Sequence, residues 1–213
     1  NDPSLLPLST IGIKIGAAAS SKIVLKSYTN IMQRLAEKGY PLAQLSNKKI
    51  TVNNQEKNMH VLVTVLPGEK AYFGPVTIKG LYRLKAKFVA KQILWQEAGV
   101  YNQKIVDNTH QRLIDTGLFG AVTITHADQL EKDNKLPLEI VVTESKHRSI
   151  GAGISYATVD GAGAFFSWEH RNLASMGQKL LFSINVAKIY SEGLARYSIP
   201  DVFFRDQSYV AEG

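Results

Sequence analysis

The sequence predicts an α+β fold in which tandem β-α-α-β-β repeats are followed by antiparallel β-strands. Two observations lead to this prediction. A helix end, a glycine stop, an extended segment and a β-branched strand recur in the same order at an offset of 78 residues. After His147, apolar residues alternate strictly with small or polar ones, which is typical of strands.

The repeat is carried by short matches that keep the same order. The matching segments are Gln33-Arg34-Leu35 and Gln111-Arg112-Leu113, Gly39 and Gly117, and Leu62–Val65 and Ile140–Thr143. In both copies the glycine can adopt the left-handed conformation that ends a helix. We therefore place a first repeat at residues 1–74 and a second repeat at residues 75–147.

The second repeat is predicted to be complete. Its expected elements are a strand at Val76–Gly80, helices at Lys85–Glu97 and Gln103–Thr116, and strands at Leu118–His126 and Leu136–Thr143. Both helices carry apolar residues at helical spacing, so each has one face for a core. We expect that core to contain Phe88, Ile93, Leu94, Val106 and Leu113.

The first repeat is predicted to contain one amphipathic helix, Ser21–Lys38, and strands near Leu42–Val52 and Met59–Val65. The inward residues of the helix are expected to be Val24, Leu25, Tyr28, Ile31, Met32 and Leu35. The counterpart of the strand at 76–80 would lie at or before residue 2. We therefore expect this repeat to lack its first strand and the chain to begin inside a repeat.

Residues 148–213 are predicted to form hairpin-connected strands. The alternation places them at Ser149–Thr158, Ala162–His170, Gln178–Ile189 and Leu194–Ile199. In the first of these strands, one side consists of Ile150, Ala152, Ile154 and Tyr156. Strands of about ten residues with this pattern are typical of outer-membrane β-barrels, but a soluble β-sandwich alternates in the same way. Both interpretations stay open on this stretch alone.

The composition excludes several kinds of site. The 213 residues include no cysteine, which removes disulfides, thiolate metal sites and thiol catalysis. The five histidines show no ligand spacing and no acidic cluster, and we interpret them as scattered surface residues. Ser155 lies inside an alternating strand, so Gly153–Ala157 is not a nucleophile elbow. We predict no catalytic residue, no metal site, no cofactor and no enzyme activity.

The formal charge of +7 is concentrated in the first repeat. Residues 1–74 hold nine Lys and Arg against four Asp and Glu, whereas residues 148–213 hold six of each. Since Lys48, Lys49 and Lys70 form no stripe with interleaved aromatics, we expect a solvated face and no nucleic-acid partner. No apolar run is long enough for a membrane-spanning helix. A binding or assembly role follows.

The candidate binding site is an unpaired strand edge. If the last strand of a β-α-α-β-β repeat lies in the middle of its sheet, the fourth element is an outer strand that an extended client segment can join. In the second repeat this edge contains Phe119, Ala121, Val122, Thr123, Ile124 and Thr125. In the first repeat it contains Lys48, Lys49, Ile50, Thr51 and Val52. The alternative, that Lys48 and Lys49 only protect their edge, stays open.

Several motifs, taken in this order, resemble the Omp85 superfamily of outer-membrane proteins. They are Tyr72-Phe73-Gly74-Pro75-Val76, Thr116-Gly117-Leu118-Phe119, Gly151–Tyr156, Gly177-Gln178-Lys179-Leu180 and Pro200-Asp201. Within the superfamily, the likeness is to the TamA branch of the bacterial surface antigen D15 type. The resemblance covers nearly the whole chain, with POTRA repeats to about His147 and then the first strands of a barrel.

The resemblance implies a Gram-negative outer-membrane protein with residues 1–147 in the periplasm. Its POTRA repeats would receive unfolded outer-membrane or secreted clients by strand augmentation, and its barrel would help insert or translocate them without a cofactor. It also implies outer-membrane lipid around the barrel and an inner-membrane-anchored periplasmic partner. About four strands precede Gly213, fewer than the eight or so that closed single-chain barrels use, so we expect a fragment.

Two alternatives stay open. A two-partner secretion transporter or exported β-rich binding module shares the layout of POTRA repeats and barrel. A soluble enzyme with an unrecognised site would need paired carboxylates or a bound metal.

Overall fold

The computed structural model describes residues 16, 20–53, 55, 58–159, 161–201 and 207–213. It divides into two compact units. Unit 1 comprises Asn1–Thr77, Leu94–Asn108 and Ile124–Glu139, and unit 2 comprises Ile78–Ile93, Thr109–Thr123 and Ile140–Gly213. Helices long and apolar enough to span a membrane are absent from the described residues. The expected loss of an opening strand in the first repeat concerns residues outside the described part.

Helix α2, Ser21–Glu37, buries the row Val24, Tyr28, Ile31 and Leu35, as its spacing predicts. Leu25 is 63% exposed, so its predicted inward position is wrong. It follows Val24 by one residue and therefore points about 100° away from the buried row. Ser27 is buried instead, because its hydroxyl donates to the main-chain carbonyl of Val24 at 2.7 Å.

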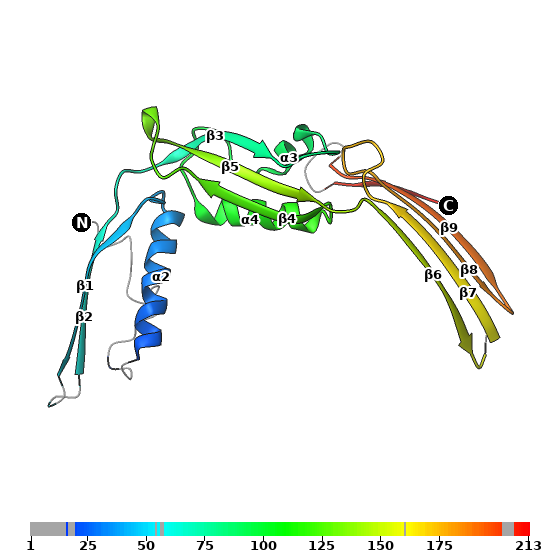
Figure 1. Ribbon diagram of the computed structural model, residues 1–213, viewed down its shortest axis with the longest axis horizontal. Coiled ribbons are helices and arrows are strands. Elements are labelled where there is room, and N and C mark those ends of the chain that lie inside the picture. Colours follow the sequence, from blue (N-terminus) through cyan, green and yellow to red (C-terminus); the bar gives the residue numbers. More distant parts are fainter. Residues whose placement is uncertain (1–15, 17–19, 54, 56–57, 160, 202–206) are drawn as a thin grey trace. The chain divides into compact units, whose positions relative to one another are not determined.

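Strands β1, Gln44–Asn53, and β2, Asn58–Leu66, form a two-stranded antiparallel sheet with a register shift between Leu45 and Asn47. Helix α2 runs beside this hairpin (Figure 1). Their shared core contains Ile31, Leu35 and Ala43, with Met32, Tyr40 and Val65 packed against it. The first repeat thus contributes one helix and one hairpin to unit 1.

The second repeat has the predicted order β-α-α-β-β. Its elements are β3, Tyr72–Lys79, α3, Ala86–Gln92, α4, Gln103–Asp115, β4, Phe119–His126, and β5, Lys135–Glu144. The strands form one sheet in the order β3-β5-β4 (Figure 1). The last strand therefore lies in the middle and β4 is an outer strand, as predicted.

Helix α3 is shorter than the predicted Lys85–Glu97. It ends at Gln92, since Ile93 has the extended angles φ −67 and ψ 125. Ile93 and Leu94 are only half-buried outside the helix, so their predicted core positions are wrong. Trp95 is buried instead, because its large ring stacks on Phe73 with centroids 5.0 Å apart.

The remaining predicted core residues, Phe88, Val106 and Leu113, are buried. In unit 1, beside the buried row of α2, the other large buried residues are Phe73, Trp95, Tyr101, Leu136 and Leu138. In unit 2, they are Leu84, Val89, Leu118, Phe119, Val122, Ile140 and Val142. Each unit therefore has apolar residues from the second repeat in its interior.

The last part of unit 2 is a five-stranded antiparallel sheet. Its strands are β6, Arg148–Ala157, β7, Gly161–His170, β8, Lys179–Ala187, β9, Ser191–Ile199, and β10, Tyr209–Glu212. They follow the order β10-β9-β8-β7-β6 (Figure 1). The first four match the predicted strands, whereas β10 was not predicted.

The register of this sheet separates two faces. Ile150 pairs with Trp168, which pairs with Phe182, and neighbouring rows add Phe166, Ile184 and Val186 to the same apolar face. The opposite face of β6 carries glycine and serine. Gly153 pairs there with Phe165, and any side chain in place of this glycine would collide with the Phe165 ring. The glycine therefore makes room for a cross-strand aromatic residue.

Candidate functional site

Strand β4 is an outer strand, and its side chains alternate along the predicted edge. Phe119 and Val122 are buried and Ile124 is half-buried, whereas the remaining predicted positions, Ala121, Thr123 and Thr125, are exposed. The Nε2–H of His110 in α4 donates to the Val122 carbonyl at 3.0 Å. Since β5 pairs with only one side of β4, an extended segment can add to the other side.

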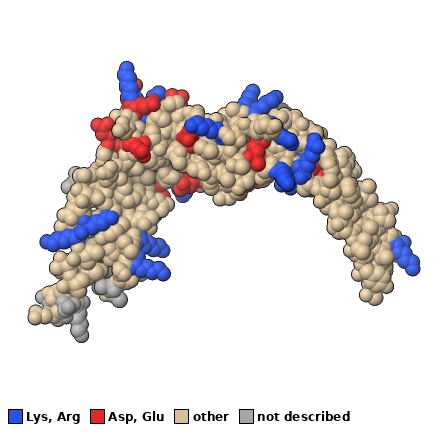
Figure 2. All heavy atoms as spheres, viewed as in Figure 1, with Lys and Arg blue, Asp and Glu red and all other residues tan. Residues whose placement is uncertain are grey.

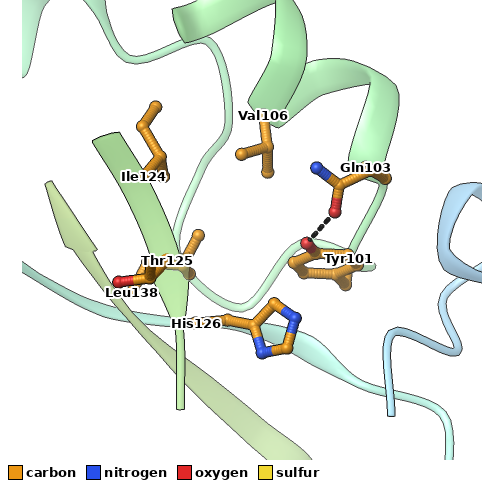
Figure 3. Close-up of a pocket in the computed structure, with 7 residues that line it drawn as sticks. All are labelled: Tyr101, Gln103, Val106, Ile124, Thr125, His126 and Leu138. Atoms are coloured by element: carbon orange, nitrogen blue, oxygen red, sulfur yellow. Dashed lines mark hydrogen bonds between the residues drawn. The ribbon is translucent and has the colours of Figure 1, made fainter. Parts of the chain in front are cut away.

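A hollow of about 310 Å³ lies beside the end of β4 (Figure 3). It is lined by Tyr101, Gln103, Val106, Ile124, Thr125, His126 and Leu138. Ile124, Thr125 and His126 belong to β4, while Gln103 and Val106 belong to α4 (Figure 3). A side chain of a segment paired with β4 could therefore enter this hollow.

Tyr101 is the most constrained residue of the hollow. It is buried, and its hydroxyl donates to the Gln103 Oε1 at 2.5 Å (Figure 3). Burial raises the pKa of this hydroxyl, and the charge of Asp107 raises it further. The edge of the His126 ring faces Tyr101, with centroids 6.2 Å apart. Tyr101 therefore stays neutral and forms a fixed aromatic wall.

Strand β3 is the opposite outer strand of the same sheet, but the first part of its edge is covered. Tyr72 forms an antiparallel bridge with Val100. Phe73 donates through its N–H to the Gly99 carbonyl at 2.8 Å and accepts the N–H of Ala98 at 2.8 Å. Further along β3, Pro75 has no N–H to offer. β3 therefore has fewer main-chain groups available for an added strand.

The second predicted edge, Lys48, Lys49, Ile50, Thr51 and Val52 in β1, is exposed at every position. Among the described residues, β1 pairs only with β2. The Lys48 Nζ lies 5.2 Å from the Tyr28 ring centroid of α2, so this lysine is held back against the helix. Edge protection and strand addition both remain compatible with this geometry.

The predicted first strand of the barrel is β6, and its apolar side is open to solvent. Ile150, Ile154 and Tyr156 are 71%, 90% and 83% exposed, and Ala152 is exposed as well. Together with the aromatic and branched residues of β7 and β8, they form a continuous exposed apolar face. A face of this kind is expected where strands meet lipid or a protein partner.

A buried carboxylate stands at the junction between β5 and β6. Glu144, the last residue of β5, accepts the main-chain N–H groups of Tyr82, Arg83 and Leu84 at distances from 2.8 to 3.1 Å. Burial opposes its ionisation, but the three donors and His147 lower the pKa of Glu144 below its ordinary value. The carboxylate thus ties the segment after β3 to the end of β5.

His147 lies in the same junction and is buried, so its interpretation as a surface residue is wrong. Its Nε2 is 3.7 Å from the Glu144 Oε2, and its Nδ1 is 3.3 Å from the Asn172 Nδ2. Burial lowers the pKa of His147 below its ordinary value, against the attraction of Glu144 and with the repulsion of Arg83 and Arg171. The ring is therefore neutral at neutral pH and can accept from the Asn172 amide.

A second polar network within unit 2 joins α3 and the last part of α4 to Asp201, which follows β9. Gln92 of α3 donates through Nε2 to the Asp201 Oδ2 at 2.7 Å and accepts at Oε1 from the Arg112 Nε at 2.7 Å. Arg112 of α4 also reaches the Asp201 Oδ1 at 3.3 Å. Gln92 is buried, and its polar atoms are satisfied by these partners.

The loop between β7 and β8 also contacts α3. Lys85 donates its N–H to the Ser175 carbonyl at 3.1 Å. Gly177 has φ +74, and an added Cβ would lie 2.6 Å from the Phe88 ring. The loop is fixed further because the Asn172 Oδ1 accepts the Gly177 N–H at 3.1 Å. Substitution of this glycine would strain both the backbone and the contact.

Sequence reasoning missed most of this junction. Asp201 was noticed only as part of Pro200-Asp201, a strand end. Gln92, Glu144, His147 and Asn172 carry no local signal, because their partners lie far away in the chain or in loops. Groups of three or more His, Cys, Asp or Glu that could hold a metal are absent from the residues that the structure describes.

Comparisons with known proteins agree with this architecture. Residues 71–145 match the POTRA family, described as surface antigen variable number repeat. The fold is therefore a POTRA β-α-α-β-β unit followed by an antiparallel five-stranded sheet. This match also supports the prediction that the chain is not an enzyme. Comparison with curated protein sequences gives no significant match.

Two solved structures have similar folds. The chain aligns with BamA from Haemophilus ducreyi lacking POTRA domains 1-3, with a TM-score of 0.81 and 18% identity over 94% of this chain and 37% of that one. It aligns with BamA POTRA3-5 from Haemophilus influenzae with a TM-score of 0.57 and 19% identity, over 64% of this chain and 53% of that one. The chain spans just over a third of the first structure and about half of the second.

Proposed function

We propose that this chain is the client-binding and barrel-entry part of an outer-membrane protein assembly factor of the Omp85 type. The main support is the combination of a POTRA match at residues 71–145 with a BamA-like fold over 94% of the chain. The POTRA unit would act in the periplasm, and the five-stranded sheet would belong to a barrel in the outer membrane. Unfolded outer-membrane or secreted proteins would be its clients, and no cofactor would be needed.

The assigned boundaries follow from this proposal. Residues 1–74 would be the end of one POTRA repeat, residues 75–147 a complete repeat, and residues 148–213 the first strands of a barrel. A finer assignment to the TamA branch, with an inner-membrane-anchored periplasmic partner, rests on the motif resemblance alone. It predicts co-purification with such a partner.

The client-binding mechanism would be strand addition at β4. The edge offers main-chain donors and acceptors, which pair with any extended sequence and so suit a broad set of clients. The hollow of about 310 Å³ beside Ile124 and Thr125 adds a place for one apolar side chain. Selectivity for alternating apolar segments would come from this hollow, while the backbone supplies most of the pairing.

The membrane part of the proposal is supported by the faces of the five-stranded sheet. One face of β6, β7 and β8 is mostly aromatic and branched, and the other carries mostly glycine, serine and asparagine, with Phe165 and Leu181 as large apolar exceptions. Between Ser149 and Trp168 the sequence contains one charged residue, Asp160. A sheet with one apolar face and few charged residues in its first hairpin suits contact with hydrocarbon on one side and polar surroundings on the other.

A peptide titration followed by amide chemical shifts would test strand addition at β4. The probe is an extended peptide with alternating apolar residues, and its control carries N-methyl groups on alternate amides, so that one edge cannot pair. We expect shifts in β4 and around Tyr101 and Val106 with the probe alone. Shifts confined to α2 and α3, or equal binding of the control, would contradict the proposal.

A further inference from the structure

An open hollow of about 680 Å³ lies at the junction that precedes β6. It is lined by Gly80, Tyr82 and Arg83 on one side and by the stretch from Val142 to Arg148 on the other. Three of its side chains, Arg83, Lys146 and Arg148, carry permanent positive charge and are exposed. All lie in unit 2, so the hollow belongs to one compact part of the chain.

The one carboxylate that lines this hollow does not neutralise the charge of these exposed cations. Glu144 is turned toward the main-chain N–H groups of Tyr82, Arg83 and Leu84, which take up its oxygens. Neither Lys146 nor Arg148 forms an ion pair within the described part of the chain. Residues 78–93, which continue from the hollow into α3, contain five Lys and Arg and no Asp or Glu. The surface is therefore strongly positive.

An exposed aromatic residue accompanies the cations. Tyr82 is 87% exposed, and the Arg83 guanidinium lies 5.9 Å from its ring centroid. Tyrosine has an apolar ring and a polar hydroxyl, which suits the boundary between hydrocarbon and water. Arginine and lysine beside it can reach phosphate groups at that boundary.

The position of the hollow along the chain agrees with such a boundary. Arg148 is the first residue of β6, and the exposed apolar face begins two residues later at Ile150. Figure 2 shows Lys and Arg side chains around α3 and the start of β6, while most of the five-stranded sheet is uncharged. The cations of the hollow thus lie directly before the start of the exposed apolar face.

We propose that the hollow formed by Arg83, Lys146 and Arg148 binds the phosphate groups of anionic phospholipids at a bilayer surface, with Tyr82 in the interfacial layer. This inference rests on the proposed function, because it needs β6 to enter the membrane beside the hollow. The occupant is a lipid surface, since the cations of the hollow adjoin the start of an exposed apolar face. The contact would fix the height of the POTRA unit at the membrane.

Vesicle flotation with the whole chain tests this proposal. The vesicles contain either phosphatidylcholine alone or phosphatidylcholine with phosphatidylglycerol. The test variant is Arg83→Gln, Lys146→Gln and Arg148→Gln together, which keeps the Arg83 N–H that Glu144 accepts. Since each cation near an anionic surface contributes about fivefold to binding, we expect the preference for anionic vesicles to fall by roughly a hundredfold.

The matched control variant removes the same number of charges elsewhere. The control replaces Lys22, Lys26 and Lys104, three exposed residues of unit 1, by Gln. The preference for anionic vesicles should change by no more than about twofold, because screening limits distant charges.

Tyr82→Ala should weaken binding to both kinds of vesicle. Inorganic phosphate, compared with chloride at equal ionic strength, should not release the protein.

The outcomes separate this inference from the proposed function. If the wild-type chain binds both vesicles equally, or if the control variant loses as much as the test variant, the lipid site is refuted while membrane entry of β6 stands. If inorganic phosphate releases the protein, the hollow holds a free anion and the bilayer proposal fails. If neither vesicle binds any variant, both the membrane part of the proposed function and this inference fail.

Discussion

The two outer strands of the POTRA sheet, β3 and β4, differ in how their edges are treated. The edge of β3 is bridged to Val100, bonded to the segment at residues 98–99 and interrupted by Pro75. Among the described residues, no isolated bridge and no proline covers the edge of β4, although His110 occupies the Val122 carbonyl, and a hollow lies beside the strand. Proteins usually protect outer strands against pairing with other chains. An edge left open next to a protected one is therefore the better candidate for a binding surface.

The largest predicted effect on the free energy of unfolding concerns the apolar core that supports the sheet of β3, β5 and β4. Leu113 in α4 is fully buried, so Leu113→Ala should lower the free energy of unfolding by about 2–5 kcal/mol. The matched control is Leu25→Ala in α2, where the side chain is already exposed and the loss should stay below about 0.5 kcal/mol. Urea titration measures both values. Equal losses in the two variants would refute the assigned facing of the helices.

A smaller effect is expected at the carboxylate that holds the segment after β3. Glu144→Gln replaces a charged acceptor of three N–H groups by a neutral one and should cost about 1–3 kcal/mol at neutral pH. Since the folded pKa of Glu144 is lowered, its contribution is complete above the ordinary value of 4.5 and is lost as pH falls through the folded value. The difference between wild type and variant should shrink in acid.

Amide hydrogen exchange in the Glu144→Gln variant compares the segment after β3 with β4. Loss of the Glu144 acceptor should speed amide exchange at Tyr82, Arg83 and Leu84, which follow β3. Exchange in β4 should change little, because the described bonds of the Glu144 side chain go to Tyr82, Arg83 and Leu84 and not to β4. A variant that opens β4 as much as the segment after β3 would contradict the local role of this carboxylate.

His147 should add a pH dependence at milder acidity. Its folded pKa is lowered from the ordinary 6.5, so the unfolded chain binds a proton more readily. Its contribution to stability is therefore complete above pH 6.5 and declines as pH falls from there toward the folded value. His147→Asn should flatten this part of the stability profile, whereas His60→Asn, at an exposed position, should not. Unchanged profiles in both variants would refute the buried position of His147.

The smallest effect on stability is expected from Pro75→Thr, which restores an N–H to the protected edge. Pro75 is exposed, so the free energy of unfolding should change by no more than about 0.5 kcal/mol. Peptide binding along β3 should nevertheless become detectable by chemical shifts, because threonine supplies the main-chain N–H that proline lacks. Binding that stays confined to β4 would show that the bridge to Val100 alone protects β3.

The sequence predicted the fold well where its signals are local and periodic. Glycine stops ended the helices near Gly39 and Gly117, and strict alternation located β6 to β9 within a few residues. The short α3 escaped prediction because Ile93 and Leu94 continue the apolar pattern beyond the last helical residue. Strand β10 was missed as well, since Tyr209–Glu212 has only four residues.

The candidate site was predicted only in part. The outer position of β4 was predicted on the condition that the last strand of the repeat lies in the middle of the sheet, and the strand order β3-β5-β4 meets that condition. The protection of β3 was not predicted, because the bridge of Tyr72 to Val100 joins residues that no local pattern connects. The network of Gln92, Arg112 and Asp201 was missed for the same reason, since Asp201 is 109 residues from Gln92.

The central claim is that an extended client pairs with β4 and not with β3, and disulfide trapping tests it most directly. The chain has no cysteine, so Thr125→Cys in β4 and Thr77→Cys in β3 each introduce one thiol at an exposed threonine. Both variants are mixed with an alternating apolar peptide that carries one cysteine, under the same mild oxidant. We expect a cross-linked product with Thr125→Cys and little with Thr77→Cys. Equal trapping at the two positions, or trapping only at Thr77→Cys, would contradict the account.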